Sequence, residues 1–256
     1  YRKIRNTFRY LLGNINDKYE DFDLDKIDIE SLPELEKFML SKIYFLNNKF
    51  ENYFKKYDFH NLYKELLNFC TTDLSAFYFD IRKDTLYCDP INSEKRKSCV
   101  TILNVLLKSL LRWFAPILSF TTEEIHQLIS KNSKSIHLEK FLTFPDKFKN
   151  EQLTERWSQL IKIRDVCNIS IEEKRASKKI GSSLEADLNI QLNKKYKEIV
   201  GDMDLSELCI VSKTVVHFDN QSDILVETKK ASGNKCSVCW KIREDPCERH
   251  PKCQIS

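Results

Sequence analysis

The sequence contains 256 residues, of which 41% are hydrophobic and 31% are charged, a composition typical of globular proteins with a substantial core. Only four glycines and six prolines occur, which favours long regular elements. The net charge of +4 equals the excess within residues 229–256, which hold seven basic and three acidic residues, so the chain is not a general polycation. The longest dense apolar run, 105–118, is too short and too charged to span a bilayer.

Residues 1–15 have the pattern of an amphipathic helix. Its apolar side is formed by Tyr1, Ile4, Phe8, Leu11, Leu12 and Ile15. A second stripe is formed by Arg2, Arg5, Asn6 and Arg9, and no acid precedes Asp17. Such a stripe suits a row of phosphates, because guanidinium groups bind phosphate oxygens in pairs, although a solvated basic face has the same pattern.

Four further helices are predicted in the first 145 residues. Their approximate ranges are Leu32–Tyr57, Asp58–Cys70, Glu94–Phe114 and Thr121–Ile129. Ser31 with Glu34, and Thr121 with Glu124, have the spacing of capping boxes. Ser93 is the predicted N-cap of the third helix. The sequence therefore predicts an antiparallel helical bundle.

The helix predicted at Glu94–Phe114 is almost entirely apolar between Val100 and Leu111, so we expect it at the centre of the bundle. Pro116 ends it. We expect Trp113, Phe114 and Leu118 to be buried where this helix ends.

The hydrophobic period changes in the second part of the chain. A long helix is predicted from Glu151 to Lys179, with Gly181 as its C-terminal cap. Two or three strands follow, within 188–192, 209–218 and 224–226, together with a short helix at Lys194–Val200. The predicted domains are thus a bundle at 1–145, a small α/β unit at 146–230 and a separate tail at 231–256.

Cysteines gather in this tail. Five of the nine are scattered and are interpreted as small buried hydrophobic residues: Cys70, Cys88, Cys99, Cys167 and Cys209. The tail contains five metal-ligand candidates, Cys236, Cys239, Cys247, His250 and Cys253. No secretory signal is visible, so we expect a reducing cytoplasm, where a Cys-x-x-Cys hook indicates zinc more than a disulfide. Trp240 beside the hook either packs beneath it or presents its ring to a base.

Several segments together resemble the C-terminal region of bacterial isoleucyl-tRNA synthetases. These are RKIRNTFRYLLGN, DLSAFYFDIRKDTLYCD, WFAPILSFTTEEI, IEEKRASKKIGSSLEA and GNKCSVCW. The resemblance implies a mainly α fold comprising an anticodon-binding bundle, a junction unit and a zinc-binding peptide. It further implies a class I ligase that attaches isoleucine to tRNA with ATP, in a cytoplasmic and monomeric protein.

The HIGH and KMSKS signatures of that chemistry are absent from this sequence, and the chain starts within a helical pattern without a methionine. We therefore expect part of a longer protein that binds tRNA and has no catalytic residues of its own. ATP and magnesium would act only in the catalytic part of that longer protein. The competing hypothesis is a zinc-stapled helical module for protein assembly without an RNA role.

The resemblance also implies which residues form the two sites. The expected zinc ligands are Cys236, Cys239, Cys253 and, as the fourth, Cys247, with His250 as the alternative. In the family the tail ends in a second Cys-x-x-Cys hook, whereas Ser256 stands here in place of the last cysteine, so either Cys247 or His250 replaces that ligand or the site is degraded. The expected tRNA contacts are Arg2, Arg5, Asn6, Arg9 and Arg82 at phosphates, with Trp240, Lys241 and Arg243 near the loop.

Overall fold

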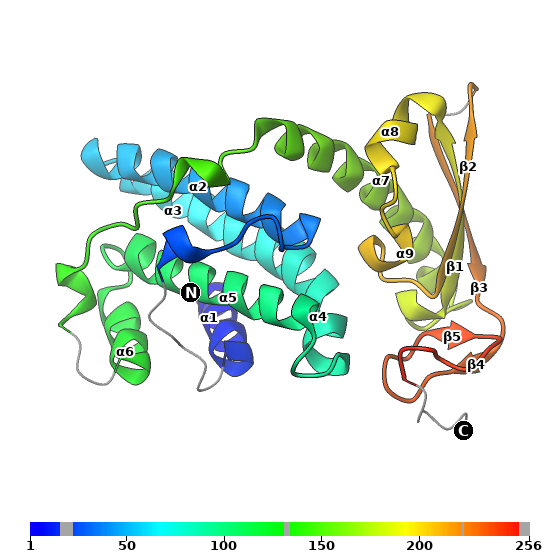
Figure 1. Cartoon of the computed structure of the whole chain (residues 1–256), viewed down its shortest axis with the longest axis horizontal. Coiled ribbons are helices and arrows are strands. Elements are labelled where there is room, and N and C mark those ends of the chain that lie inside the picture. The colour runs from blue at the N-terminus through cyan, green and yellow to red at the C-terminus, as the bar shows by residue number, and fades with distance from the viewer. Residues whose placement is uncertain (16–22, 131–133, 222, 251–256) are drawn as a thin grey trace. The chain divides into compact units, whose positions relative to one another are not determined.

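The computed structural model describes residues 1–15, 23–130, 134–221 and 223–250 (Figure 1). Contacts divide the chain into two compact units, Tyr1–Thr154 and Glu155–Ser256, so residues 231–256 fall within the second unit. Each unit is described by itself. None of the described helices is both long enough and apolar enough to cross a membrane.

All the regular elements in the described residues of the first unit are helices. Its main elements are α1 (Arg2–Ile15), α2 (Glu34–Lys55), α3 (Phe59–Asn68), the π-helix η3 (Phe69–Tyr78), α4 (Phe79–Cys88), α5 (Glu94–Phe114) and α6 (Ser119–Ile129), with short 3₁₀ turns η2 (Leu24–Lys26), η4 (Ile136–Leu138) and η5 (Asp146–Phe148). The helix α5 has the predicted bounds and packs against α1, α2, α4 and α6. The prediction of a helical bundle around this central helix is confirmed.

Aromatic residues fill the core at the end of α5. Trp113 is fully buried, its ring meets Phe50 edge-on, and its Nε1–H donates to Asn47 Oδ1 at 3.0 Å. Phe114 is also fully buried. Leu118 is only half-buried, so the expectation for that residue is wrong.

Both predicted capping boxes are wrong, because other groups start these helices. The Ser31 hydroxyl donates to the carbonyl of Asp28 in a preceding turn, and α2 begins only after Pro33. The backbone is already helical before Thr121, since the N–H of Thr122 donates to the carbonyl of Leu118. The predicted cap Ser93 is correct, since its side chain accepts from the N–H of Arg96. Asp58, where the sequence predicts that the next helix begins, is the N-cap of α3 and accepts from the N–H of Asn61.

Residues 59–88 form a continuous helical segment whose middle part, η3, has the wider π-helical turn. A search for a 3.6-residue period locates the helix at Asp58–Cys70 but does not reveal this change of turn. The wider turn shifts the faces of the helix, and consecutive residues Phe77, Tyr78 and Phe79 are all buried.

The second unit contains a three-stranded sheet with helices beside it (Figure 1). Its elements are α7 (Glu151–Ala176, which begins in the first unit), η6 (Ser183–Glu185), β1 (Ala186–Asn193), η7 (Lys194–Tyr196), α8 (Lys197–Val200), α9 (Leu205–Leu208), β2 (Lys213–Asp219) and β3 (Ile224–Lys230). The strand order is β2-β1-β3, with β2 parallel and β3 antiparallel to β1. The predicted alternation is confirmed, since Leu188, Ile190 and Leu192 are all buried.

The helix α7 ends earlier than predicted and through a different residue. Lys178 adopts a left-handed conformation with φ of 57°, and the N–H of Lys179 donates to the carbonyl of Lys174. This pair of features is a Schellman motif, in which a glycine is usual. Gly181 lies beyond the motif, so its predicted role as the cap is wrong.

Candidate metal centre and nucleic-acid interface

A small hairpin carries the Cys-x-x-Cys hook. Strands β4 (Asn234–Lys235) and β5 (Ile242–Arg243) pair antiparallel, and the turn between them holds Cys236 and Cys239. The N–H of Cys236 donates to the carbonyl of Lys241, and the N–H of Trp240 donates to the carbonyl of Cys236, each at 2.9 Å. The local hydrogen bonds therefore fix the hook independently of any side chain.

Gly233 makes the approach to this hairpin possible. Its φ is 116°, and a Cβ at this position would lie 2.2 Å from the carbonyl oxygen of Arg243. Only glycine fits so close to the opposite backbone.

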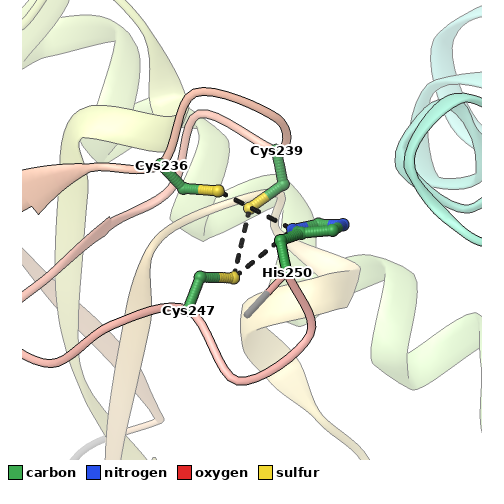
Figure 2. Close-up of side chains that lie close together, drawn as sticks. All are labelled: Cys236, Cys239, Cys247 and His250. Carbon is green, nitrogen blue, oxygen red and sulfur yellow. Dashed lines mark hydrogen bonds between the residues drawn. The ribbon is translucent and has the colours of Figure 1, made fainter. Parts of the chain in front are cut away.

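Four potential metal ligands converge beside the hairpin, two from the hook and two from the loop after β5 (Figure 2). The Sγ atoms of Cys239 and Cys247 lie 3.9 Å apart. The Nδ1 atom of His250 lies 3.4 Å from Cys247 Sγ and 3.7 Å from Cys236 Sγ. All four ligand atoms lie within 4.8 Å of one another.

These separations fit a tetrahedral zinc ion. Zinc–sulfur bonds of about 2.3 Å place two sulfurs about 3.8 Å apart in a tetrahedron, and the zinc–nitrogen bond is shorter. The three cysteines are buried, and burial raises the pKa of the Cys239 thiol to about 12 in the metal-free protein. A bound cation would lower such a pKa and stabilise the thiolates. The arrangement can therefore hold a structural metal.

Three of the four predicted ligands, Cys236, Cys239 and Cys247, are brought together by the fold. The fourth position in the described cluster is occupied by His250, whereas Cys253 lies outside the described residues. A sequence signal for His250 exists, because Cys247-x-x-His250 repeats the spacing of the hook. The family resemblance, by contrast, predicts sulfur at all four positions.

Basic and aromatic side chains surround this metal centre. Trp240 is 59% exposed and has a positive φ of 63°, so it does not pack beneath the hook. Lys235 Nζ lies 5.5 Å from the centroid of its ring, a cation–π distance. Arg243 is exposed and Lys241 is half-buried. An exposed indole ring can stack on a nucleic-acid base, and the cations around it can bind the phosphates on either side of that base.

The basic stripe of α1 lies at the surface, as the helical period predicts. Its core face contains Ile4, Phe8, Leu11 and Ile15, whereas Tyr1 is 62% exposed, contrary to expectation. The stripe residues Arg2, Arg5, Asn6 and Arg9 are all exposed. Within the described ranges, none of the three arginines has a carboxylate within 4.0 Å, so their charge is uncompensated by an ion pair.

Arg82 does not belong to this surface, and its predicted role as a phosphate contact is wrong. Its side chain is buried and forms an ion pair with the buried carboxylate of Glu36, with Nε and Oε1 2.6 Å apart. A guanidinium held in this way has no access to a phosphate.

Residues 36–192, more than half of the chain, match the family described as anticodon-binding domain of tRNA ligase. The chain therefore belongs to this family of tRNA-ligase domains. Among curated proteins it is 64% identical, over 98% of its length, to the isoleucine–tRNA ligase of Pelagibacter ubique (strain HTCC1062). It is 37% and 39% identical, over 96% and 94% of its length, to those of Bartonella quintana (strain Toulouse) and Brachyspira hyodysenteriae (strain ATCC 49526 / WA1).

These alignments cover 28%, 26% and 27% of the three relatives, so the chain spans about a quarter of their length. They confirm the resemblance to isoleucyl-tRNA synthetases that the sequence motifs indicate.

Proposed function

We propose that this chain is the tRNA-binding part of an isoleucine–tRNA ligase and binds the anticodon stem-loop of the isoleucine tRNA. The observation that carries the proposal is the exposed stripe of Arg2, Arg5 and Arg9, whose charge no described carboxylate pairs, in a chain whose residues 36–192 match the anticodon-binding family. Guanidinium groups one helical turn apart are suited to successive phosphates of one strand.

The stripe on α1 and the residues beside the metal centre would contact different parts of the tRNA. Arg2, Arg5, Asn6 and Arg9 would bind phosphates and position the stem, which carries no sequence information by itself. Trp240, Lys241 and Arg243 would lie near the loop, where unstacked bases can be recognised on aromatic rings. The complete ligase would attach isoleucine using ATP and magnesium bound outside these residues.

Zinc would serve as a structural cofactor of the second site. Cys236, Cys239, Cys247 and His250 have the donor types and separations for one ion, with Cys253 as the competing fourth ligand. Few apolar side chains lie near the hook to form a core, so metal binding would supply much of its folding free energy.

A salt titration of tRNA binding tests the function. The chain should bind isoleucine tRNA, and its affinity should fall steeply with ionic strength, because phosphate contacts release counterions. A zinc-stapled module for protein assembly is the alternative, and it predicts no binding to any tRNA at low salt. Absence of binding at about 50 mM salt would contradict the proposal.

A further inference from the structure

An exposed cluster of aromatic rings lies where α2 meets α3 in the first unit. Its members are Phe54, Tyr57, Phe59 and Phe141, and we call it the corner cluster. Phe54 contacts Phe59 and Phe141 with ring centroids 5.6 and 5.5 Å apart, and Tyr57 lies 6.4 Å from Phe59. The inner rings hold one another in place, whereas the Tyr57 side chain is 81% exposed.

Tyr57 occupies a backbone position that favours glycine. Its φ is 56°, and the N–H of Asp58 donates to the carbonyl of Tyr53, so Tyr57 ends α2 as the left-handed residue of a Schellman motif. A tyrosine here is disfavoured by the backbone, and its exposed ring gains little from packing. Neither local conformation nor the core therefore explains why a large ring stands at this position.

The groove beside the corner cluster is open and carries charges of both signs, because Glu51 pairs with Lys55 and Glu139 pairs with Arg112. A groove of about 390 Å³ is lined by Phe54, Phe141, Lys55 and Lys140 among other residues. Lys140 in this groove and Lys56 beside Tyr57 are exposed, and neither has a carboxylate within 4.0 Å in the described part of the chain. The nearby carboxylate of Asp58 is occupied in capping α3 through Asn61.

We propose that the corner cluster is a stacking platform for an unpaired nucleotide of the bound tRNA. Every base has a π-face that can stack on an aromatic ring, and the phosphates on either side of it would be neutralised by Lys56 and Lys140. An apolar protein segment would not use the charge of Lys56 and Lys140. The inference rests on the proposed function, because it assigns one contact of the same RNA.

The decisive variant is Tyr57→Gly in the full 256-residue chain. Glycine removes the ring and relieves the left-handed backbone, so the unfolding midpoint should stay the same or rise. Tyr57→Asn provides a second ring-free variant that tolerates this conformation, and Tyr57→Phe retains the ring. Tyr87→Ala is the matched control, since Tyr87 is an exposed tyrosine of the same unit outside the corner cluster.

Affinity is measured for an anticodon stem-loop RNA and for a blunt duplex of the same stem. Loss of one stacked base should weaken stem-loop binding by about 5- to 150-fold in Tyr57→Gly and Tyr57→Asn. Binding of the duplex should not change, and Tyr57→Phe and Tyr87→Ala should bind both RNAs like the wild type. This pattern would support the platform.

Three results would overturn the inference. Unchanged stem-loop affinity in Tyr57→Gly, in a protein whose binding Arg5→Ala weakens, would reject the platform but retain the proposed function. Unchanged affinity together with loss of self-association would assign the corner cluster to a contact between copies of the chain. Absence of tRNA binding by the wild type would reject both proposals.

Discussion

The guanidinium of Arg82 on α4 forms two parallel hydrogen bonds, each 2.6 Å long, to the carboxylate of Glu36 on α2. Both side chains are buried, and the hydroxyl of Tyr78 donates a further hydrogen bond to Glu36 Oε1. Burial raises the pKa of Tyr78 well above its ordinary value, so this hydroxyl stays a neutral donor. The pair fixes how α2 and α4 meet within the bundle.

Removing one partner of this pair should be strongly destabilising. Arg82→Met leaves the carboxylate of Glu36 buried and uncompensated, and the free energy of unfolding should fall by about 3–5 kcal/mol. The double variant Glu36→Leu/Arg82→Met should recover much of the loss. The matched control is Lys83→Met, which breaks only the exposed pair with Asp80 and should cost less than about 1 kcal/mol. Denaturant unfolding measures the free energy of unfolding of all three variants. Equal losses in Arg82→Met and Lys83→Met would show that the buried pair stabilises the protein no more than an exposed one.

Trp113→Ala should destabilise the first unit by about 3–5 kcal/mol, because it creates a cavity beside Phe50. It also removes the donor that pairs with Asn47 Oδ1. Thermal or denaturant unfolding checks this value. A change below about 1 kcal/mol would mean that the surrounding rings collapse into the space.

The end of α7 offers a test at two positions, Lys178 and Gly181, only one of which has the left-handed backbone that favours glycine. Lys178→Gly should raise the free energy of unfolding by about 1 kcal/mol, since φ at this position is 57°. Gly181→Ala should change it by less than about 0.5 kcal/mol, because an added Cβ would meet Glu185 Oε2 at an ordinary 3.5 Å. A large loss in Gly181→Ala would restore Gly181 as the cap.

Zinc analysis of the purified protein should find one ion per chain. Cys247→Ser and His250→Gln should each lower the zinc content or the affinity for zinc, since each removes one of the four converging donors. Cys88→Ser is the control, because Cys88 lies on α4 in the other unit and should leave zinc unchanged. Loss of zinc in Cys253→Ser but not in His250→Gln would identify the sulfur as the fourth ligand instead.

Much of the fold could be predicted because it depends on periodicity. The central helix α5 and the alternating strand β1 bury nearly all of their apolar side chains, so their patterns are strong. The capping boxes failed because other groups satisfied the backbone: a turn made by Ser31 and a helical start before Thr121. Cap spacing alone does not show which of several polar side chains the chain uses.

The metal ligands of the candidate site could be predicted from local spacing, whereas the surroundings of Arg82 could not. The metal ligands lie within 15 residues of one another in the sequence, in the hook and in the loop after β5, so their spacing indicates that Cys236, Cys239 and Cys247 come together. The environment of Arg82 depends on Glu36, 46 residues earlier, and no local pattern reveals that pairing. The π-helical turn of η3 also moves residues to faces that a 3.6-residue period assigns elsewhere.

The most direct test of tRNA binding is the salt dependence of affinity in Arg5→Ala, Arg9→Ala and the double variant. Each single change should weaken binding about equally for isoleucine tRNA and for other tRNAs, and should reduce the salt slope by about one unit. Lys97→Ala is the matched control, because this exposed cation is already paired with Glu94 at 2.7 Å and should bind like the wild type. Affinity and slope that remain unchanged in the double variant would show that the stripe on α1 is only a solvated face, and would contradict the account.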